Sequence, residues 1–395
     1  MREKKNICPV CGSKSVSIFA EVKEVLIHCN LLWNTRESAL NARRGELKLG
    51  FCMNCGHVFN TAFDPEAMKY SEEYENSLHF SPFFQDYARS LAVKLIERYD
   101  LYEKDIIEIG CGKGDFLLLL SELGGNRAIG FDASYIRDPL DSRCSKVSFI
   151  QDLYSEKYSH FKGDMILSRQ VLEHIKSPRL FVKNMRSATG SRPGAVVFCE
   201  VPNFMHTIKE LAVWDIIYEH YSYFTPTSFR RLFKADGFRI ERLEESFEGQ
   251  FLCLEAKPAE TPARDENEDE DKPAFDALML EVAAFFRRYT DKIAAWKCEL
   301  TRTAVRGQKA VVWGAGSKGV SFINTLKAAG QISHVVDINP RKQGKFVPGT
   351  GQEIVGPEAL KDIDPDLIII MNPIYISEIW ETVKSMGLNC RILTA

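Results

Sequence analysis

The sequence predicts an α/β protein with two α/β units, preceded by a small segment that carries cysteine pairs. Short apolar strands alternate with amphipathic helices between residues 105 and 258, and the same alternation returns between residues 309 and 395. Each unit opens with a strand that runs into a glycine-rich turn. Strands that alternate with helices in this way form a mostly parallel sheet with helices on both faces.

The composition excludes several broad classes of protein. The 395 residues are 45% hydrophobic and 27% charged, which is ordinary for a globular chain and rules out a fibre or a wholly disordered protein. A net charge of −3 gives no general attraction to nucleic acid or to an anionic membrane. There is no apolar run of membrane-spanning length, and no apolar secretory signal follows the first methionine. We therefore expect a cytoplasmic protein with reduced thiols.

Two Cys-x-x-Cys-Gly motifs lie within residues 1–66, which we expect to form a zinc-binding domain. The pairs are Cys8 with Cys11 and Cys52 with Cys55. Each pair offers two thiolates to one ion, and four thiolates leave no open coordination position, so we predict a structural zinc site. His28 and Cys29, in the excursion between the pairs, are the weaker alternative ligands.

The elements of the first α/β unit follow from its apolar pattern. Helical spacing is expected from Pro65 to about Tyr102. The strands predicted after it are Ile106–Ile109, Arg127–Phe131, Val147–Ile150, Asp164–Ser168, Ala195–Glu200, Phe238–Glu244 and Phe251–Ala256. β-rich runs of this length, separated by turns and helical stretches, are typical of parallel sheets.

A sharp change in composition separates the two units. Residues 259–273 are rich in Asp and Glu and almost without apolar side chains, which indicates a solvated linker. A long amphipathic helix is expected from Phe275 to about Thr303. The strands predicted in the second unit are Ala310–Trp313, Ser333–Asp337, Leu367–Met371 and Cys390–Leu393.

The first glycine-rich turn is the most informative motif in the chain. An apolar strand carries Glu108 near its end and leads into Gly110, Gly112 and Gly114 before a helix begins. Glycines let the backbone approach a ligand where a side chain would clash. The next strand ends at Asp132, whose carboxylate can accept hydrogen bonds from both hydroxyls of a ribose. The pattern therefore predicts a site for a nucleoside.

Two later strands extend this site. The third strand ends at Asp152, where a polar side chain could meet the amino group of an adenine. The fourth leads into Gln170 and a Leu-Glu-His turn that contains His174. Together these residues resemble the class I S-adenosylmethionine-dependent methyltransferases. The resemblance implies that the turn at Gln170 lies under the methionine moiety and that His174 is chiefly architectural.

A second cluster of chemically active residues follows the fifth strand. The segment between residues 214 and 224 contains three tyrosines together with Glu219 and His220. So many titratable groups among aromatic residues are costly to bury without a purpose, and a neutral histidine is the usual general base near pH 7. The alternative is an aromatic core whose polar tips are satisfied.

Taken together, the cysteine pairs, the methyltransferase-like core, the Glu-His segment and the C-terminal run from Asp337 to Thr350 resemble the sugar C-methyltransferase family. The resemblance implies a Rossmann-like class I methyltransferase core with a small N-terminal zinc domain and a second C-terminal Rossmann-like α/β domain. It implies a zinc-binding domain over 1–66, an S-adenosylmethionine-binding domain over 67–258, an acidic linker over 259–273, and a helix with a substrate-binding domain over 274–395. The acceptor would be a nucleotide-linked ketosugar.

In the chemistry that the resemblance implies, His220 removes a proton next to a carbonyl and Glu219 orients the imidazole. The family's Tyr-His-Glu-His-Phe motif reads Ile217-Tyr218-Glu219-His220-Tyr221 here, so its first tyrosine is missing. Tyr218 or Tyr74 would then stabilise the enolate oxygen. These departures keep open an O- or N-methyltransferase that acts on another glycan or natural product.

The second glycine-rich turn permits a different function. Gly314, Gly316 and Gly319 follow a strand in the spacing of a dinucleotide-binding motif, and Asp337 lies 18 residues beyond the last glycine. On these residues alone, an NAD-dependent or non-catalytic binding protein is the alternative. The family resemblance instead implies a unit that helps to hold the nucleotide-sugar.

Overall fold

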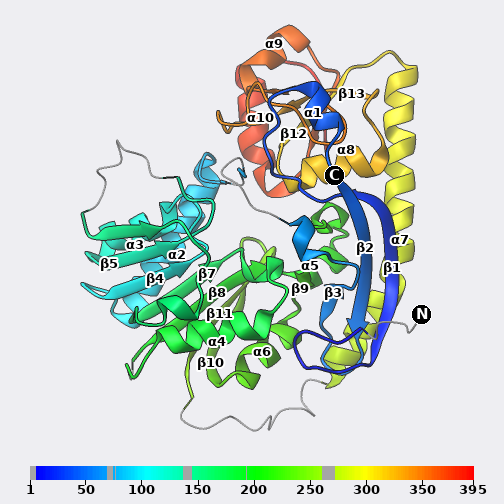
Figure 1. Ribbon diagram of the computed structural model, residues 1–395. Coiled ribbons are helices and arrows are strands. Elements are labelled where there is room, and N and C mark those ends of the chain that lie inside the picture. Colours follow the sequence, from blue (N-terminus) through cyan, green and yellow to red (C-terminus); the bar gives the residue numbers. More distant parts are fainter. Residues whose placement is uncertain (1–5, 69–73, 76, 137–144, 193, 260–271) are drawn as a thin grey trace.

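The structure is a computed structural model that describes residues 6–68, 74–75, 77–136, 145–192, 194–259 and 272–395. The chain forms three sheets. In Figure 1 the first α/β unit lies on the left and the C-terminal unit at the top, and the N-terminal strands lie between the first unit and a long helix on the right. Most of the acidic segment expected as a linker lies outside the described residues. Within the described part of the chain, no helix combines the length and the apolar character that a membrane crossing requires.

The N-terminal sheet contains a strand from a distant part of the chain. Its order is β1 (Val16–Leu26), β2 (Arg44–Cys52), β3 (Val58–Asn60) and β9 (Ser222–Tyr223), all antiparallel, and the excursion between β1 and β2 holds α1 (Arg36–Leu40). The second cysteine pair forms the turn between β2 and β3. Because β9 lies inside the Glu-His segment (residues 214–224), two positions after His220, its pairing with β3 fixes that segment against the N-terminal sheet.

The helical pattern predicted from Pro65 onward is wrong for the residues before Pro82. Among the described residues from Pro65 to Ser81, the one helix is the short 3-10 helix η1 (Pro65–Ala67), and α2 spans Pro82–Tyr99. Ser81 caps α2 by accepting a hydrogen bond from the backbone of Phe84. Proline lacks a backbone N–H and fits best in the first turn of a helix, so Pro82 marks a start.

The first α/β unit contains a seven-stranded sheet of order β10-β11-β8-β7-β4-β5-β6. Its strands are β4 (Asp105–Ile109), β5 (Arg127–Phe131), β6 (Val147–Ile150), β7 (Met165–Arg169), β8 (Val196–Pro202), β10 (Phe238–Ser246) and β11 (Phe251–Pro258). β11 runs against both of its neighbours, and the remaining pairs are parallel. Each predicted strand of this unit is present, with ends that differ by no more than about two residues.

Helices cover both faces of this sheet, as the alternation in the sequence predicted. They are α2, α3 (Asp115–Gly124), α4 (Pro178–Ala188) and α6 (Pro226–Ala235), with the 3-10 helices η2 (Glu156–Tyr158) and η3 (Leu172–His174). In contrast, α5 (Phe204–Lys209) and the 3-10 helix η4 (Val213–Asp215) belong to the apolar cluster that also contains residues of α7 (Lys272–Val305) and α8 (Ser317–Leu326). Along β8, Val196 and Phe198 pack in the cluster of α2 and α3, whereas Val197 and Cys199 pack in the cluster of α4 and α6. The strand is therefore buried on both faces.

The C-terminal unit is a parallel sheet of order β14-β13-β12-β15-β16, preceded by the 34-residue helix α7 (Lys272–Val305). Its elements are β12 (Ala310–Trp313), α8 (Ser317–Leu326), β13 (Ile332–Val336), β14 (Ile354–Val355), η5 (Pro357–Ala359), α9 (Leu360–Ile363), β15 (Leu367–Ile370), η6 (Pro373–Tyr375), α10 (Ile376–Ser385) and β16 (Arg391–Thr394). The predicted fold, a Rossmann-like methyltransferase core with a second α/β unit, is confirmed.

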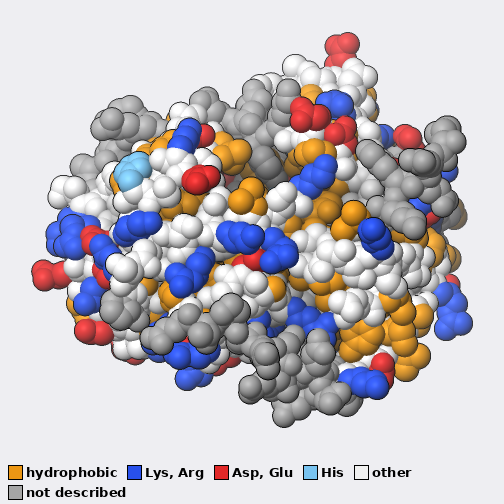
Figure 2. All heavy atoms as spheres, turned by 60° about the horizontal axis from the view of Figure 1, so that its bottom comes forward, with side chains coloured by type: hydrophobic (Ala, Val, Ile, Leu, Met, Phe, Trp, Pro, Cys, Tyr) orange, Lys and Arg blue, Asp and Glu red, His pale blue; other side chains and the backbone are white. Residues whose placement is uncertain are grey.

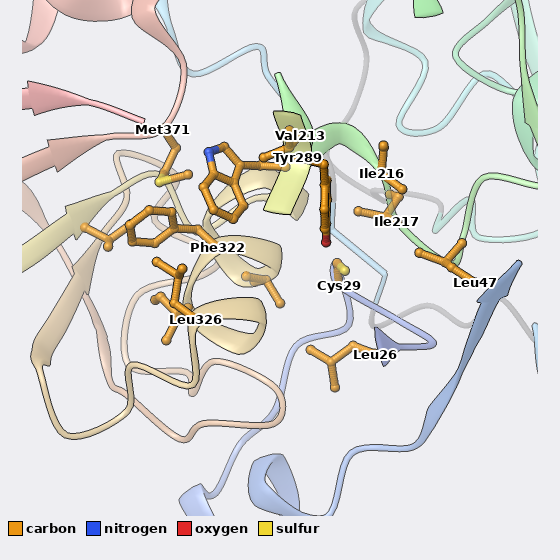
Figure 3. Close-up of a cluster of buried hydrophobic side chains, with 14 of the residues drawn as sticks. Leu26, Cys29, Leu47, Val213, Ile216, Ile217, Tyr289, Phe322, Leu326 and Met371 are labelled. Atoms are coloured by element: carbon orange, nitrogen blue, oxygen red, sulfur yellow. The ribbon is translucent and has the colours of Figure 1, made fainter. Parts of the chain in front are cut away.

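One apolar cluster joins the parts of the chain that surround the site (Figure 3). Leu47 of the N-terminal sheet, Ile217 of the Glu-His segment, Tyr289 of α7 and Phe322 of α8 all belong to it. Complete burial of a side chain of this size contributes roughly 1.5–3 kcal/mol. The N-terminal sheet, the Glu-His segment and the C-terminal unit therefore hold fixed positions relative to one another.

Candidate functional site

A cavity of about 300 Å³ lies where the three parts of the chain meet. Asn30 from the N-terminal excursion, His220 from the first unit and Lys318 from the C-terminal unit all line it. A volume of this size is at the lower end of the range of small-molecule sites. The cavity therefore brings together the Glu-His segment, Gln170 and the second glycine-rich turn, which the sequence predicted separately.

The first glycine-rich turn forms a loop that leaves room for a ligand. Gly110, Gly112 and Gly114 all have positive φ angles, of 77°, 55° and 83°. A Cβ atom at Gly110 would lie 2.2 Å from Val171, and one at Gly114 would lie 2.4 Å from the ring of Phe149. At Gly112, in contrast, a Cβ atom would meet nothing within 4 Å. The loop backbone is packed on both sides and open in the middle, which fits a bound nucleoside.

Two acidic residues flank this loop. Glu108 is 3% exposed, its Oε2 has no hydrogen-bond partner among the described residues, and burial raises its pKa to about 8. Asp132 accepts hydrogen bonds from the backbone N–H of Gly112 at 2.8 Å and from that of Ser134 at 2.7 Å. Asp132 thereby ties the loop to the end of β5, and Glu108 presents an unsatisfied carboxyl oxygen beneath it.

The other two residues predicted to bind the donor have different surroundings. The carboxylate of Asp152 bonds to Lys157 and to the Tyr158 hydroxyl, and these contacts lower its pKa to about 2. Gln170 has a φ of 55°, and its side-chain amide donates to Glu200 at 3.2 Å. Gln170 lies on the cavity wall, whereas the carboxylate of Asp152 is engaged within its own turn.

Glu219 is the centre of a buried hydrogen-bond network on the acceptor side of the cavity. Its Oε1 accepts from the backbone N–H of Cys29 at 2.5 Å and from that of Asn30 at 3.3 Å, and its Oε2 accepts from the Tyr74 hydroxyl at 2.5 Å. The Asn30 amide also donates to the Tyr74 oxygen at 3.3 Å. We expected the Glu219 carboxylate to orient the imidazole of His220, but these contacts commit it to Tyr74 and to the N-terminal excursion instead.

The two candidate tyrosines are separated by the fold. Tyr74 lines the cavity, whereas Tyr218 is not among the described residues that do so. The ring of Tyr218 stacks on Phe63 at 5.5 Å, and its hydroxyl oxygen accepts from the backbone N–H of Asp64 at 2.8 Å. The phenol of Tyr218 is therefore used inside the protein, and of these two tyrosines Tyr74 is the one that lines the cavity.

Two histidines stand next to each other on the same wall. The rings of His174 and His220 are 5.0 Å apart at an angle of 77°. His174 Nδ1 donates to the backbone carbonyl of Glu219 at 2.9 Å. The sequence did not predict this contact, because it showed His174 only as part of a turn. Burial lowers the pKa of His174 to about 4 and the pKa of His220 well below its usual value. Both imidazoles are therefore neutral near pH 7, the state in which a histidine acts as a base.

The C-terminal unit adds positive charge to the opposite wall. A Cβ atom at Gly319 would lie 1.9 Å from the carbonyl oxygen of Gly314, so the second glycine-rich turn must be tight. Lys318, in the first turn of α8, forms an ion pair with Asp215, and Lys342 is 5% exposed with its Nζ 3.5 Å from Asp337. Helix N-termini and lysines both attract anions. Neither lysine was among the predicted site residues, although Lys318 lies inside the second glycine-rich motif.

Comparison with known proteins identifies the family. A methyltransferase domain matches residues 84–243, and a C-methyltransferase C-terminal domain matches residues 263–389. The two matched domains together describe a methyltransferase that ends in the C-terminal domain of C-methyltransferases. It is 25% identical over 315 residues to the C-methyltransferase NovU of Streptomyces niveus, a match that covers 75% of this chain and 73% of NovU.

Solved methyltransferase structures resemble part of this C-methyltransferase. The 1,6-didemethyltoxoflavin-N1-methyltransferase of Burkholderia thailandensis is 15% identical and covers 53% of this chain and 98% of its own, with a TM-score of 0.36. Magnesium protoporphyrin IX methyltransferase from Synechocystis is 17% identical and covers 44% and 83%, with a TM-score of 0.34. With its methyltransferase domain and its glycine loop, this C-methyltransferase is an S-adenosylmethionine-dependent enzyme.

The four N-terminal cysteines of the C-methyltransferase come together as one group. Their sulfur atoms all lie within 4.8 Å of one another, with Cys8 and Cys55 at 3.5 Å and Cys11 and Cys52 at 3.5 Å. Such a group could hold a metal ion. His28 and Cys29 do not belong to this group, and Cys29 instead donates its backbone N–H to Glu219.

Proposed function

We propose that this C-methyltransferase transfers a methyl group from S-adenosylmethionine to a carbon atom of a nucleotide-linked ketosugar. The observation that carries the proposal is the shared cavity, in which His220, Tyr74 and Gln170 line the same space as the second glycine-rich turn and two lysines of the C-terminal unit. The match to a C-methyltransferase C-terminal domain and the similarity to the C-methyltransferase NovU support the reaction type. Lysines and a base that line the same cavity support an acceptor with both a phosphate and an acidic C–H bond.

In this reaction, His220 acts as the general base. A carbonyl acidifies the neighbouring C–H bond, and the neutral imidazole takes that proton. Bound S-adenosylmethionine supplies a methyl group on a sulfonium, which is an electrophile. The carbanion that His220 generates is the nucleophile that this methyl group requires. A positioned general base typically contributes about 10²–10⁴ in rate.

Tyr74 would stabilise the negative oxygen of the enolate. Its hydroxyl now donates to Glu219, whose pKa burial raises above its ordinary value. A protonated Glu219 reverses that hydrogen bond, so that the hydrogen of Tyr74 becomes available to the enolate oxygen. The amide of Asn30 keeps the phenol in place during this change. Donors placed where charge develops are among the largest contributions to catalysis.

The C-terminal unit would hold the diphosphate of the acceptor. The N-terminus of α8 presents backbone N–H groups and Lys318 to the cavity, and Lys342 lies beside the same turn. Phosphate groups bind readily at such helix ends. Binding would draw Lys318 from its ion pair with Asp215 toward the phosphate.

We also propose that the cysteine group holds a structural zinc ion. Zn–S bonds of about 2.3 Å in a tetrahedron place the sulfur atoms about 3.8 Å apart, which agrees with the observed 3.5 Å contacts. Cys8, Cys52 and Cys55 are buried, so water does not reach three of the four ligands. A closed site of this kind contributes folding free energy rather than chemistry.

Incubation with S-adenosylmethionine and a panel of nucleotide ketosugars tests the function. The expected result is a gain of one methyl mass in at least one acceptor. Deuterium uptake from solvent at the acceptor carbon, in the absence of the donor, would show proton abstraction. Methyl transfer to an oxygen or nitrogen atom, without such exchange, would instead establish an O- or N-methyltransferase.

A single variant tests the role of the base. His220→Asn should lose methyl transfer by at least about 10²-fold while S-adenosylhomocysteine binds with unchanged affinity. Methyl transfer within a few-fold of the native rate would show that His220 is not the base.

A further inference from the structure

A second group of metal-ligand side chains lies on the wall of the cavity. Glu173, His174 and His220 each direct one ligand atom into a group whose members all lie within 4.8 Å of one another. All three residues line the cavity, so the group opens toward the space that an acceptor would enter. It is separate from the cysteine group, which lies by the β2–β3 turn.

The hydrogen bonding of His174 matches that of a metal ligand. A backbone carbonyl can only accept, so His174 Nδ1 must carry the hydrogen in its contact with Glu219. In the neutral imidazole the lone pair is then on Nε2, which lies 3.8 Å from Glu173 Oε1. Metal-binding histidines almost always donate their other N–H to a carbonyl or a carboxylate in this way.

Glu173 supplies an independent reason for a cation at this place. Its side chain is 2% exposed, and Oε2 has no hydrogen-bond partner among the described residues. A buried oxygen without a partner costs roughly 1–3 kcal/mol. The Nδ1–H of His174 cannot relieve that cost, because it already donates to the backbone carbonyl of Glu219. A metal ion between the three residues would satisfy the carboxylate.

We propose that Glu173, His174 and His220 bind one divalent transition-metal ion of the zinc type, and that this ion and the acceptor exclude each other. Two imidazoles and one carboxylate are a ligand set that zinc accepts, with one position left open to the cavity. The ion would occupy the lone pair of His220 and part of the acceptor space. The binding itself is independent of the proposed function, whereas the block on methyl transfer rests on His220 being the base.

Cobalt titration of the zinc-loaded protein tests the binding. Native protein should take up one further Co²⁺ with visible absorption bands of a nitrogen and oxygen site and no thiolate-to-cobalt charge-transfer band. His174→Asn and Glu173→Gln should each weaken that uptake by at least about tenfold. His160→Asn, which changes an exposed histidine outside the group, should bind Co²⁺ as the native protein does. Zinc content before titration reports that each variant is folded.

Native protein that takes up no further Co²⁺, or a His174→Asn variant that binds it unchanged, overturns the site. Zn²⁺ at the affinity measured for Co²⁺ should stop methyl transfer without changing the binding of S-adenosylhomocysteine, and a chelator should restore turnover. If the ion binds and turnover continues, the exclusion is wrong although the site stands. If the protein binds the ion but methylates none of the ketosugars tested, the metal site stands and the proposed function is wrong.

Discussion

At the scale of single residues, the acceptor site depends on contacts between distant parts of the chain. Glu219 bonds to Cys29 and Asn30, which lie about 190 residues earlier in the sequence, and to Tyr74. The sequence identified Tyr74, Glu219 and His220 as candidates but left Tyr74 and Tyr218 equivalent. The residues next to a tyrosine in the sequence do not determine the direction of its ring. That direction depends on packing against distant partners, as Tyr218 packs against Phe63.

A pair of tyrosine variants separates the two roles. Tyr74→Phe should lower kcat by about 10²-fold, because it removes the donor that would face the enolate oxygen. Tyr218→Phe should retain most of the activity and lose roughly 1 kcal/mol of stability, because its hydroxyl oxygen accepts only from the protein's own backbone at Asp64. Steady-state kinetics and thermal unfolding of both variants check this. Equal losses of kcat would contradict the assignment.

The lowered pKa of His220 fixes the direction of the pH dependence. An unperturbed imidazole is protonated below about pH 6.5 and would lose its activity as a base there. Burial lowers the pKa of His220 well below that value, so the neutral base persists into more acidic solution. We expect kcat/KM to stay level from pH 8 to about pH 6, measured beside the binding of S-adenosylhomocysteine. A halving of kcat/KM near pH 6.5, with unchanged donor binding, would show an ordinary histidine.

At the scale of elements, the apolar strands of the α/β units were predictable, whereas β1 and β2 of the N-terminal sheet and the shortest strands were not. The strands of both α/β units are apolar runs bounded by turns, and they appear where the pattern places them. β9 and β14 have two residues each, too few for any periodicity. The helix predicted from Pro65 failed because the cap at Ser81 and the proline after it decide the start of α2. The pairing of β9 with β3 could not be seen, since it joins residues more than 160 positions apart.

This pairing makes the cysteine group a support for the active site. Cys52→Ser should release the ion from the β2–β3 turn, lower Tm by roughly 5–10 °C and reduce methyl transfer more than donor binding, because β3 holds the Glu-His segment through β9. Cys298→Ser, which changes an exposed cysteine of α7, should leave Tm, zinc content and activity unchanged. Metal analysis with calorimetry checks both variants. Full activity in a zinc-free Cys52→Ser protein would contradict this role.

At the scale of the whole molecule, charged side chains lie on the surface. The two α/β units are joined by polar contacts around the cavity. Figure 2 shows one face of the molecule, with Lys and Arg side chains across it and fewer Asp and Glu side chains among them. Inside, Gln250 and Asn372 exchange two hydrogen bonds of 3.0 Å across the units. No composition or spacing pattern could predict these contacts, because they depend on how two complete folds dock.

The ion pair between Lys318 and Asp215 is the contact across the units with the clearest consequence for function. Lys318 lies in the first turn of α8, where the helix dipole also attracts anions, and it lines the cavity. Lys318→Ala should raise KM for a nucleotide-linked acceptor by about 10–100-fold, since a hydrogen bond to a charged group is worth about 1.5–3 kcal/mol. The donor binds at the other glycine loop, so the affinity for S-adenosylhomocysteine should not change.

Lys327 provides the matched control, because it ends the same helix on the side away from the cavity lining. Lys327→Ala removes an equal charge from α8 and should leave both KM and donor affinity as they are in the native protein. Raising the salt concentration should weaken acceptor binding in native protein and in Lys327→Ala, but much less in Lys318→Ala. If the two variants behave alike, the charge of Lys318 acts at long range or not at all. A rise in KM confined to Lys318→Ala requires a direct contact between this helix end and the phosphate, and so places the acceptor across both units.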